Sequence, residues 1–185
     1  MSGFQSFKDH FLLAMPGLTD PMFGHSLIYL CEHTDEGAMG LVINKATHLL
    51  WTEIFASLGL ETGRESSEHI LAGGPVAPDR GFVLHPPGVS WESSMAISDS
   101  ISLTTSLDII AALAKGEGPQ PCLVTLGYSG WSGGQLEQEL MSNSWLTVAA
   151  DPHILFHTPA EQRLDAAART LGIDINLLGD NAGHA

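Results

Sequence analysis

Two pairs of apolar runs in this chain are joined by connections too short to cross over a sheet. The runs SLIYLC (26–31) and AMGLVI (38–43) are separated by residues 32–37, and the runs ILAG (70–73) and GFVL (81–84) follow the same plan. Parallel neighbours need a crossover of about a dozen residues or more, whereas antiparallel neighbours can be joined by a short turn. We therefore expect two hairpins, and a sheet that is at least partly antiparallel.

Helical periodicity predicts four helices between and after these runs. Leu50, Ile54 and Leu58 recur at helical spacing, which places them on one face of a helix. Near the C-terminus, Thr158 followed by Pro159 has the pattern of an N-cap and a first helical residue. The four predicted helices cover about residues 50–58, 107–114, 135–141 and 159–171.

The remaining apolar segments complete a mixed architecture. CLVTLGY (122–128), WLTVAA (145–150) and ILF (154–156) read as further strands. Strands interleaved with helices, including antiparallel pairs, indicate a mixed α+β fold. The 185 residues contain no interior linker, so we expect one domain over residues 1–185, with a mobile tail at 179–185.

Charge and cysteine usage restrict the partners and the compartment. Seven Lys and Arg residues against 21 Asp and Glu residues give a formal net charge of −14. This balance disfavours direct binding to nucleic acid or to anionic lipid, because both depend on clustered basic residues. The start of the chain lacks a secretory signal pattern, and Cys31 and Cys122 read as two buried free thiols. We expect a cytoplasmic protein that has no membrane span.

Scarce cations beside glycine-rich strand ends mark a candidate ligand site. If these strand ends converge, their side chains and backbone N–H groups could bind a carboxylate or a phosphate. The alternative is that each cation pairs with an acidic residue, as Arg80 could with its neighbour Asp79. The candidate residues are Asn44, Lys45, Gly73, Gly74, Asp79, Arg80, Tyr128 and Trp131.

The segment Gly130–Gly134 matches the G-x-S-x-G pattern of a hydrolase nucleophile, with His153 or His157 as the candidate base. A helix-capping role is favoured instead, because Ser132 and Gln135 have the spacing of a capping box. The segment between the strand and Ser132 also reads as too long for the abrupt turn of a nucleophile elbow. No catalytic residue, metal site or cofactor is predicted, since potential metal ligands do not occur in paired motifs.

Several longer segments together resemble one protein family. They are LLAMPGLTDPMFGHSLIYLCEHTDEGAMGLVINK (12–45), LAGGPVAPDRGFVLH (71–85) and LVTLGYSGWSGGQLEQEL (123–140). In this order they resemble the bacterial YqgE/AlgH family. The resemblance implies a cytosolic protein with a strongly curved, mostly antiparallel sheet surrounded by helices, and it supplies no catalytic residues.

The residues and the resemblance together predict a non-catalytic binding or regulatory module for a small anionic ligand or a protein partner. Two alternatives stay open at this point: a hydrolase that uses Ser132, and a transcriptional regulator that acts indirectly. The regulatory label comes from the family resemblance alone.

Overall fold

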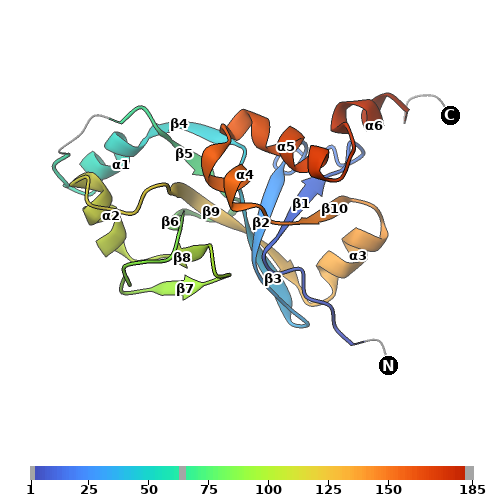
Figure 1. Cartoon of the computed structure of the whole chain (residues 1–185), viewed down its shortest axis with the longest axis horizontal. Helices are drawn as coiled ribbons and strands as arrows, with labels where there is room; N and C mark the ends of the chain where they lie inside the picture. The colour runs from blue at the N-terminus through green and yellow to red at the C-terminus, as the bar shows by residue number, and fades with distance from the viewer. Residues whose placement is uncertain (1–2, 63–65, 182–185) are drawn as a thin grey trace.

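Strand β9 (Leu123–Ser132) organises the fold, because it pairs with three other strands along its length. The computed structural model describes residues 3–62 and 66–181. Its sheet has ten strands, and Figure 1 shows it curling below and behind helices α4 and α5. The other strands are β1 (His10–Ala14), β2 (Leu27–Thr34), β3 (Gly37–Val42), β4 (Ala46–Leu50), β5 (His69–Ala72), β6 (Val76–His85), β7 (Ser94–Ala96), β8 (Ser102–Thr104) and β10 (Trp145–Ala149).

The strand order is β10-β1-β2-β3-β9-β6-β8-β7, and the β4–β5 pair joins β9 separately. Within the described ranges, the β5–β9 pair is parallel and every other pair is antiparallel. The predicted α+β class with a curved, mostly antiparallel sheet is therefore confirmed.

The first predicted hairpin is present, whereas the prediction of the second is wrong. Strands β2 and β3 pair antiparallel across a tight turn, as expected. Strands β5 and β6 do not pair with each other, because β9 pairs with both and lies between them. Gly73 and Gly127 allow this arrangement: a Cβ on Gly73 would lie 2.3 Å from the carbonyl oxygen of Gly127. The short connection thus joins strands on opposite sides of a third strand.

Helices occur in six places among the described residues rather than in four. They are α1 (Trp51–Ser57), α2 (Leu107–Ala114), α3 (Gln135–Met141), α4 (Pro152–His157), α5 (Arg163–Thr170) and α6 (Ile175–Asn181), with a short 3₁₀ turn at Ala160–Gln162. The predicted strand 154–156 is wrong, since these residues form α4. The side chain of Asp151 accepts a hydrogen bond from the backbone N–H of His153 and caps that helix.

The final predicted helix is confirmed in part. The chain is helical over most of 160–170, but Thr158 does not cap it. The Thr158 hydroxyl donates to the carbonyl of His153 and so closes the end of α4. Helix α6 runs to Asn181, inside the tail predicted to be mobile, and residues 182–185 lie outside the described part.

The two faces of the sheet are covered by different helices. Because side chains alternate along a strand, Phe11 and Leu13 pack toward α4, α5 and α6, whereas Leu12 and Ala14 pack toward α3. Helices α1 and α2 pack against β5, β6 and β9. The buried apolar side chains between them form a separate cluster that includes Ile109. No helix in the described residues is long and apolar enough to cross a bilayer.

Candidate functional site

The structure places the predicted site residues in three different environments. Asn44 and Lys45 hold the preceding loop in place. The amide oxygen of Asn44 accepts from the N–H of Leu27, and its amide nitrogen donates to the carbonyl of His25. The ammonium group of Lys45 donates to the carbonyl of Met22 at 2.6 Å, and desolvation lowers its pKa. The polar groups of both side chains therefore bind backbone groups of their own chain.

Gly73 and Gly74 lie where two backbones cross. The carbonyl of Gly73 accepts from the N–H of Val42 and from the hydroxyl of Ser129. A Cβ on Gly74 would lie 2.2 Å from the backbone of Tyr128. The glycines are needed here so that the connection between β5 and β6 can pass close to β9.

Arg80, Tyr128 and Trp131 come together on a groove of about 800 Å³. We call it the Arg80 groove. The guanidinium of Arg80 lies 5.6 Å from the ring centre of Phe82, and among the described residues it makes no ion pair with Asp79 or any other acid. The other residues that line the groove include Glu32, Thr34, Glu36, Met39, Val76, Met95 and Leu103.

Ser132 is the last residue of β9, so residues 128–131 before it are strand and not an intervening loop as expected. The predicted helix-capping role of Ser132 is wrong: the N-cap of α3 is Gly134, and the side chain of Gln135 accepts from the backbone N–H of Ser132 at 3.0 Å. In the described part, the Ser132 hydroxyl bonds only this same side chain. His153 and His157 lie on α4, which is well separated from the start of α3 in Figure 1.

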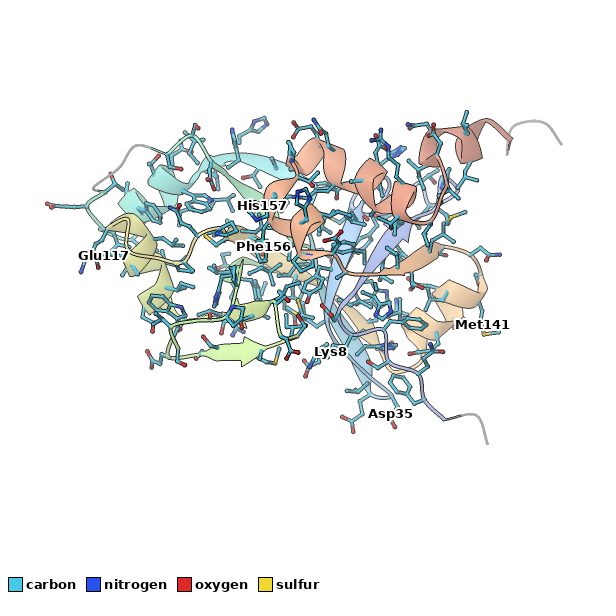
Figure 2. All side chains as sticks on the ribbon, in the orientation of Figure 1. Lys8, Asp35, Glu117, Met141, Phe156 and His157 are labelled. Atoms are coloured by element: carbon cyan, nitrogen blue, oxygen red, sulfur yellow. The ribbon has the colours of Figure 1, made fainter. Side chains whose placement is uncertain are left out.

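A second hollow, of about 580 Å³, lies between helices α4 and α5 and the strands β4, β5 and β9. We call it the Arg163 cavity. Figure 2 labels Phe156, one of its lining residues, on the side of α4 that faces β9. Its lining residues are Ala46, Trp51, Ser67, Glu68, His69, Leu71, Gln120, Pro121, Cys122, Leu123, Val124, Phe156, Pro159, Ala160, Glu161 and Arg163.

Arg163 is the unusual residue of this cavity. Its side chain is buried, with 6% of its surface exposed, at the start of α5. Its Nε donates to the carbonyl of Thr158 at 3.0 Å, and its Nη1 donates to the carbonyl of Ile43. Within residues 3–62 and 66–181, no carboxylate lies within 4.0 Å of the guanidinium, and its Nη2 makes no hydrogen bond.

The cavity changes the ionisation of three groups. Desolvation lowers the pKa of Arg163 to about 10, so the guanidinium still carries its charge at neutral pH. Desolvation also raises the pKa of Glu68, although the nearby charge of Arg163 acts in the opposite direction. Burial raises the pKa of the Cys122 thiol to about 12. A protonated Cys122 is a poor nucleophile and a poor metal ligand.

The sequence analysis singled out Lys45 and Arg80 and missed Arg163. A usable signal was present: Arg163 precedes Ala167 by four residues, which places both on one helical face, and Ala167 is a small apolar residue suited to the buried face. The described residues contain no group of three or more His, Cys, Asp or Glu that could hold a metal ion.

Comparison with known proteins gives the family. The model of the AlgH-like family matches residues 11–176. A UPF0301 protein of Saccharophagus degradans is 52% identical over 98% of this chain and 90% of its own length. A UPF0301 protein of Thioalkalivibrio sulfidiphilus is 50% identical over the full length of both chains.

Two solved structures share the fold. The solution structure of the AlgH protein from Pseudomonas aeruginosa has a TM-score of 0.82 at 47% identity, and covers 100% of this chain and 99% of its own. A crystal structure of a protein from Corynebacterium diphtheriae has a TM-score of 0.75 at 16% identity, over 97% and 94% of the two chains, and supports the fold alone. The relatives match nearly the whole chain, and the predicted resemblance is confirmed: this protein belongs to the AlgH-like family.

Proposed function

We propose that this protein is a non-catalytic binding module for a small organic anion, with Arg163 as the residue that holds the anionic group. One observation carries the proposal: a buried guanidinium without a carboxylate within 4.0 Å in the described residues borders a cavity of about 580 Å³. Arginine is rarely buried unless it is paired, because taking the charge out of water is costly.

Two backbone carbonyls satisfy part of this requirement. They accept from Nε and Nη1 and orient the guanidinium, but they carry no charge that would neutralise it. Nη2 retains donors that fit an oxygen of a carboxylate or phosphate. The cavity volume also falls in the range of small-molecule sites, which is about 300–1,000 Å³. A bound anion would supply an opposite charge in direct contact with the guanidinium.

We place this activity in the cytoplasm. Both cysteines are buried free thiols in the structure, and a reducing compartment keeps such thiols reduced. The proposal includes no covalent step, so any regulatory effect would follow from whether the cavity is occupied.

Thermal unfolding with added anions tests the proposal. The probes are 3-phenylpropionate, benzoate and inorganic phosphate, each compared with sodium chloride at equal ionic strength. At about 100 times Kd, a ligand of the folded state raises Tm by about 5–10 °C in a domain of this size. We expect at least one of the organic anions to produce such a shift.

Three variants locate the site. Arg163→Lys keeps the charge but loses the planar fork, and should reduce the shift. Arg169→Lys makes the same change at an exposed position of α5 and should leave it intact. Ala160→Phe fills the cavity wall without removing any Arg163 hydrogen bond, and should also abolish the shift. If no anion stabilises the wild-type protein beyond sodium chloride, the proposal is wrong.

The Arg80 groove is the second candidate site for an anion. It contains three of the predicted residues, Arg80, Tyr128 and Trp131, and the guanidinium is free of ion pairs in the described ranges. The cavity is favoured because Arg163 is buried, whereas Arg80 is exposed and already solvated by water.

A further inference from the structure

The lining of the Arg163 cavity restricts the chemical class of its ligand. More than half of the lining residues are apolar, and they extend from the guanidinium toward β4, β5 and the start of β9. A small inorganic ion would leave this surface in contact with water, whereas an organic body would cover it. The apolar lining residues are Ala46, Trp51, Leu71, Pro121, Leu123, Val124, Phe156, Pro159 and Ala160.

The charges of the cavity restrict the ligand further. Arg163 is the one Lys or Arg residue among the described residues that line the cavity, and Glu68 and Glu161 also line it. Both carboxylates act on the guanidinium through space, although neither reaches within 4.0 Å of it. The remaining titratable groups of the lining are His69 and Cys122. Among the lining residues that the structure describes, a second negative charge on a ligand would therefore meet two carboxylates and no second lysine or arginine.

We infer that the Arg163 cavity is selective for a monocarboxylate attached to an apolar body, and that Glu68 excludes dianions such as phosphate monoesters. This inference rests on the proposed function, because it assigns the substrate class of the same site. In physical terms, the carboxylate binds Nη2 of Arg163 while the apolar body lies against the Trp51 and Phe156 walls.

The ionisation of Glu68 supports this selectivity. Glu68 is exposed, yet desolvation raises the pKa of its carboxyl. The carboxyl thus accepts a proton at a higher pH than an ordinary glutamate, and protonation removes its repulsion of an anion. Affinity for the carboxylate should increase as the pH falls toward the pKa of Glu68.

Two ligands with the same apolar body test the inference by calorimetric titration at pH 8. They are 3-phenylpropionate, a monoanion, and 2-phenylethyl phosphate, a dianion at this pH. We expect the phosphate to bind wild-type protein about tenfold more weakly, a cost reasonable for like charges at a partly screened site. In Glu68→Gln the difference in affinity between the two ligands should become severalfold smaller.

Glu61→Gln is the matched control, since Glu61 is exposed in the segment after α1 and does not line the cavity. It should leave the tenfold difference unchanged. Equal binding of both ligands to wild type, with no effect of Glu68→Gln, would overturn the selectivity while anion binding stands. Absence of binding by either ligand would overturn the proposed function as well.

Discussion

Two hollows of this protein each contain an arginine, and the two arginines are used in opposite ways. In the Arg163 cavity the guanidinium is buried and donates to two backbone carbonyls. In the Arg80 groove it is exposed and lies over the ring of Phe82. Strand β9 connects the two: Leu123 and Val124 line the cavity, and Tyr128 lines the groove.

The difference shows which of the two guanidinium groups needs compensation from the fold for lost hydration. An exposed guanidinium costs little wherever it lies, because water solvates it. A buried one is retained only where hydrogen bonds and opposite charge compensate the lost hydration. Arg163 therefore has the stronger claim to a functional or structural role, and substitutions at the two positions should differ accordingly.

The largest effect is expected for Arg163→Met. This change leaves the carbonyls of Ile43 and Thr158 without their donor, and we expect the free energy of unfolding to fall by about 3 kcal/mol. Urea denaturation measures it. Arg169→Met, an exposed change on the same helix, should cost about 0.5 kcal/mol or less. Equal losses in the two variants would show that the Arg163 bonds contribute nothing specific.

A second substitution tests the link between the two hollows. Gly127 has a φ of +76°, and its Cβ would lie 2.3 Å from the carbonyl oxygen of Gly74. We expect Gly127→Ala to destabilise the protein by about 2 kcal/mol or more, because a left-handed φ and a backbone clash combine. Denaturation monitored by tryptophan fluorescence would measure this.

Gly134→Ala is the control for that experiment. Gly134 has a φ of +80°, yet no atom lies within 4 Å of its Cβ position. Gly134→Ala should lower the free energy of unfolding by about 1 kcal/mol, because only the left-handed φ opposes this substitution. If the two variants are equally destabilised, the close crossing of β9 is not a constraint on the fold.

This crossing also explains what the sequence could and could not predict. The apolar runs and the first hairpin are local features, and the β2–β3 pair formed as expected. The placement of β9 between β5 and β6 depends on contacts between residues more than forty positions apart in sequence, such as Leu71 with Thr125. Periodicity within one segment contains no information about such pairing.

Short apolar segments show the same limit. The run at 154–156 is too short for periodicity to separate strand from helix, and the deciding signal was Asp151 before Pro152, an N-cap followed by a proline suited to the first turn. The candidate site comes together in part: the carbonyl of Lys45 accepts from the N–H of Ala72, and Gly74 lies against the backbone of Tyr128, but the side chains of Asn44 and Lys45 bind elsewhere. Asn44 and Lys45 were identified by residue type, but their hydrogen-bond partners, such as His25 and Met22, lie in a loop with no recognisable pattern.

The pH dependence of stability should have opposite signs for two glutamates. Glu68 in the cavity has a raised pKa, so its contribution to stability is full below its ordinary value of 4.5 and is lost as the pH rises through the raised pKa. Glu68→Gln should therefore become more stable than wild type toward neutral pH. Unfolding free energies measured between pH 4 and pH 8 would show this change of slope.

Glu137, on α3, should behave in the reverse way. Desolvation opposes its charged form, but the hydrogen bond with His33, a backbone hydrogen bond and the charge of His33 together outweigh this and lower its pKa. Its contribution is present above pH 4.5 and is lost as the pH falls through the lowered pKa. Glu137→Gln should be less stable than wild type at neutral pH and approach it in acid. Slopes of the same sign in both variants would contradict these assignments.

The smallest effect is expected in the Arg80 groove. Arg80→Gln removes an exposed cation 5.6 Å from the ring centre of Phe82, and should lower the free energy of unfolding by about 0.5 kcal/mol. It should leave the Tm shift caused by 3-phenylpropionate unchanged, because the anion is held at Arg163. If Arg80→Gln instead abolishes that shift while Arg163→Lys preserves it, the anion site lies in the groove. The exposed cation would then be the functional one, and the two hydrogen bonds of Arg163 would serve only to fasten α5 to the sheet.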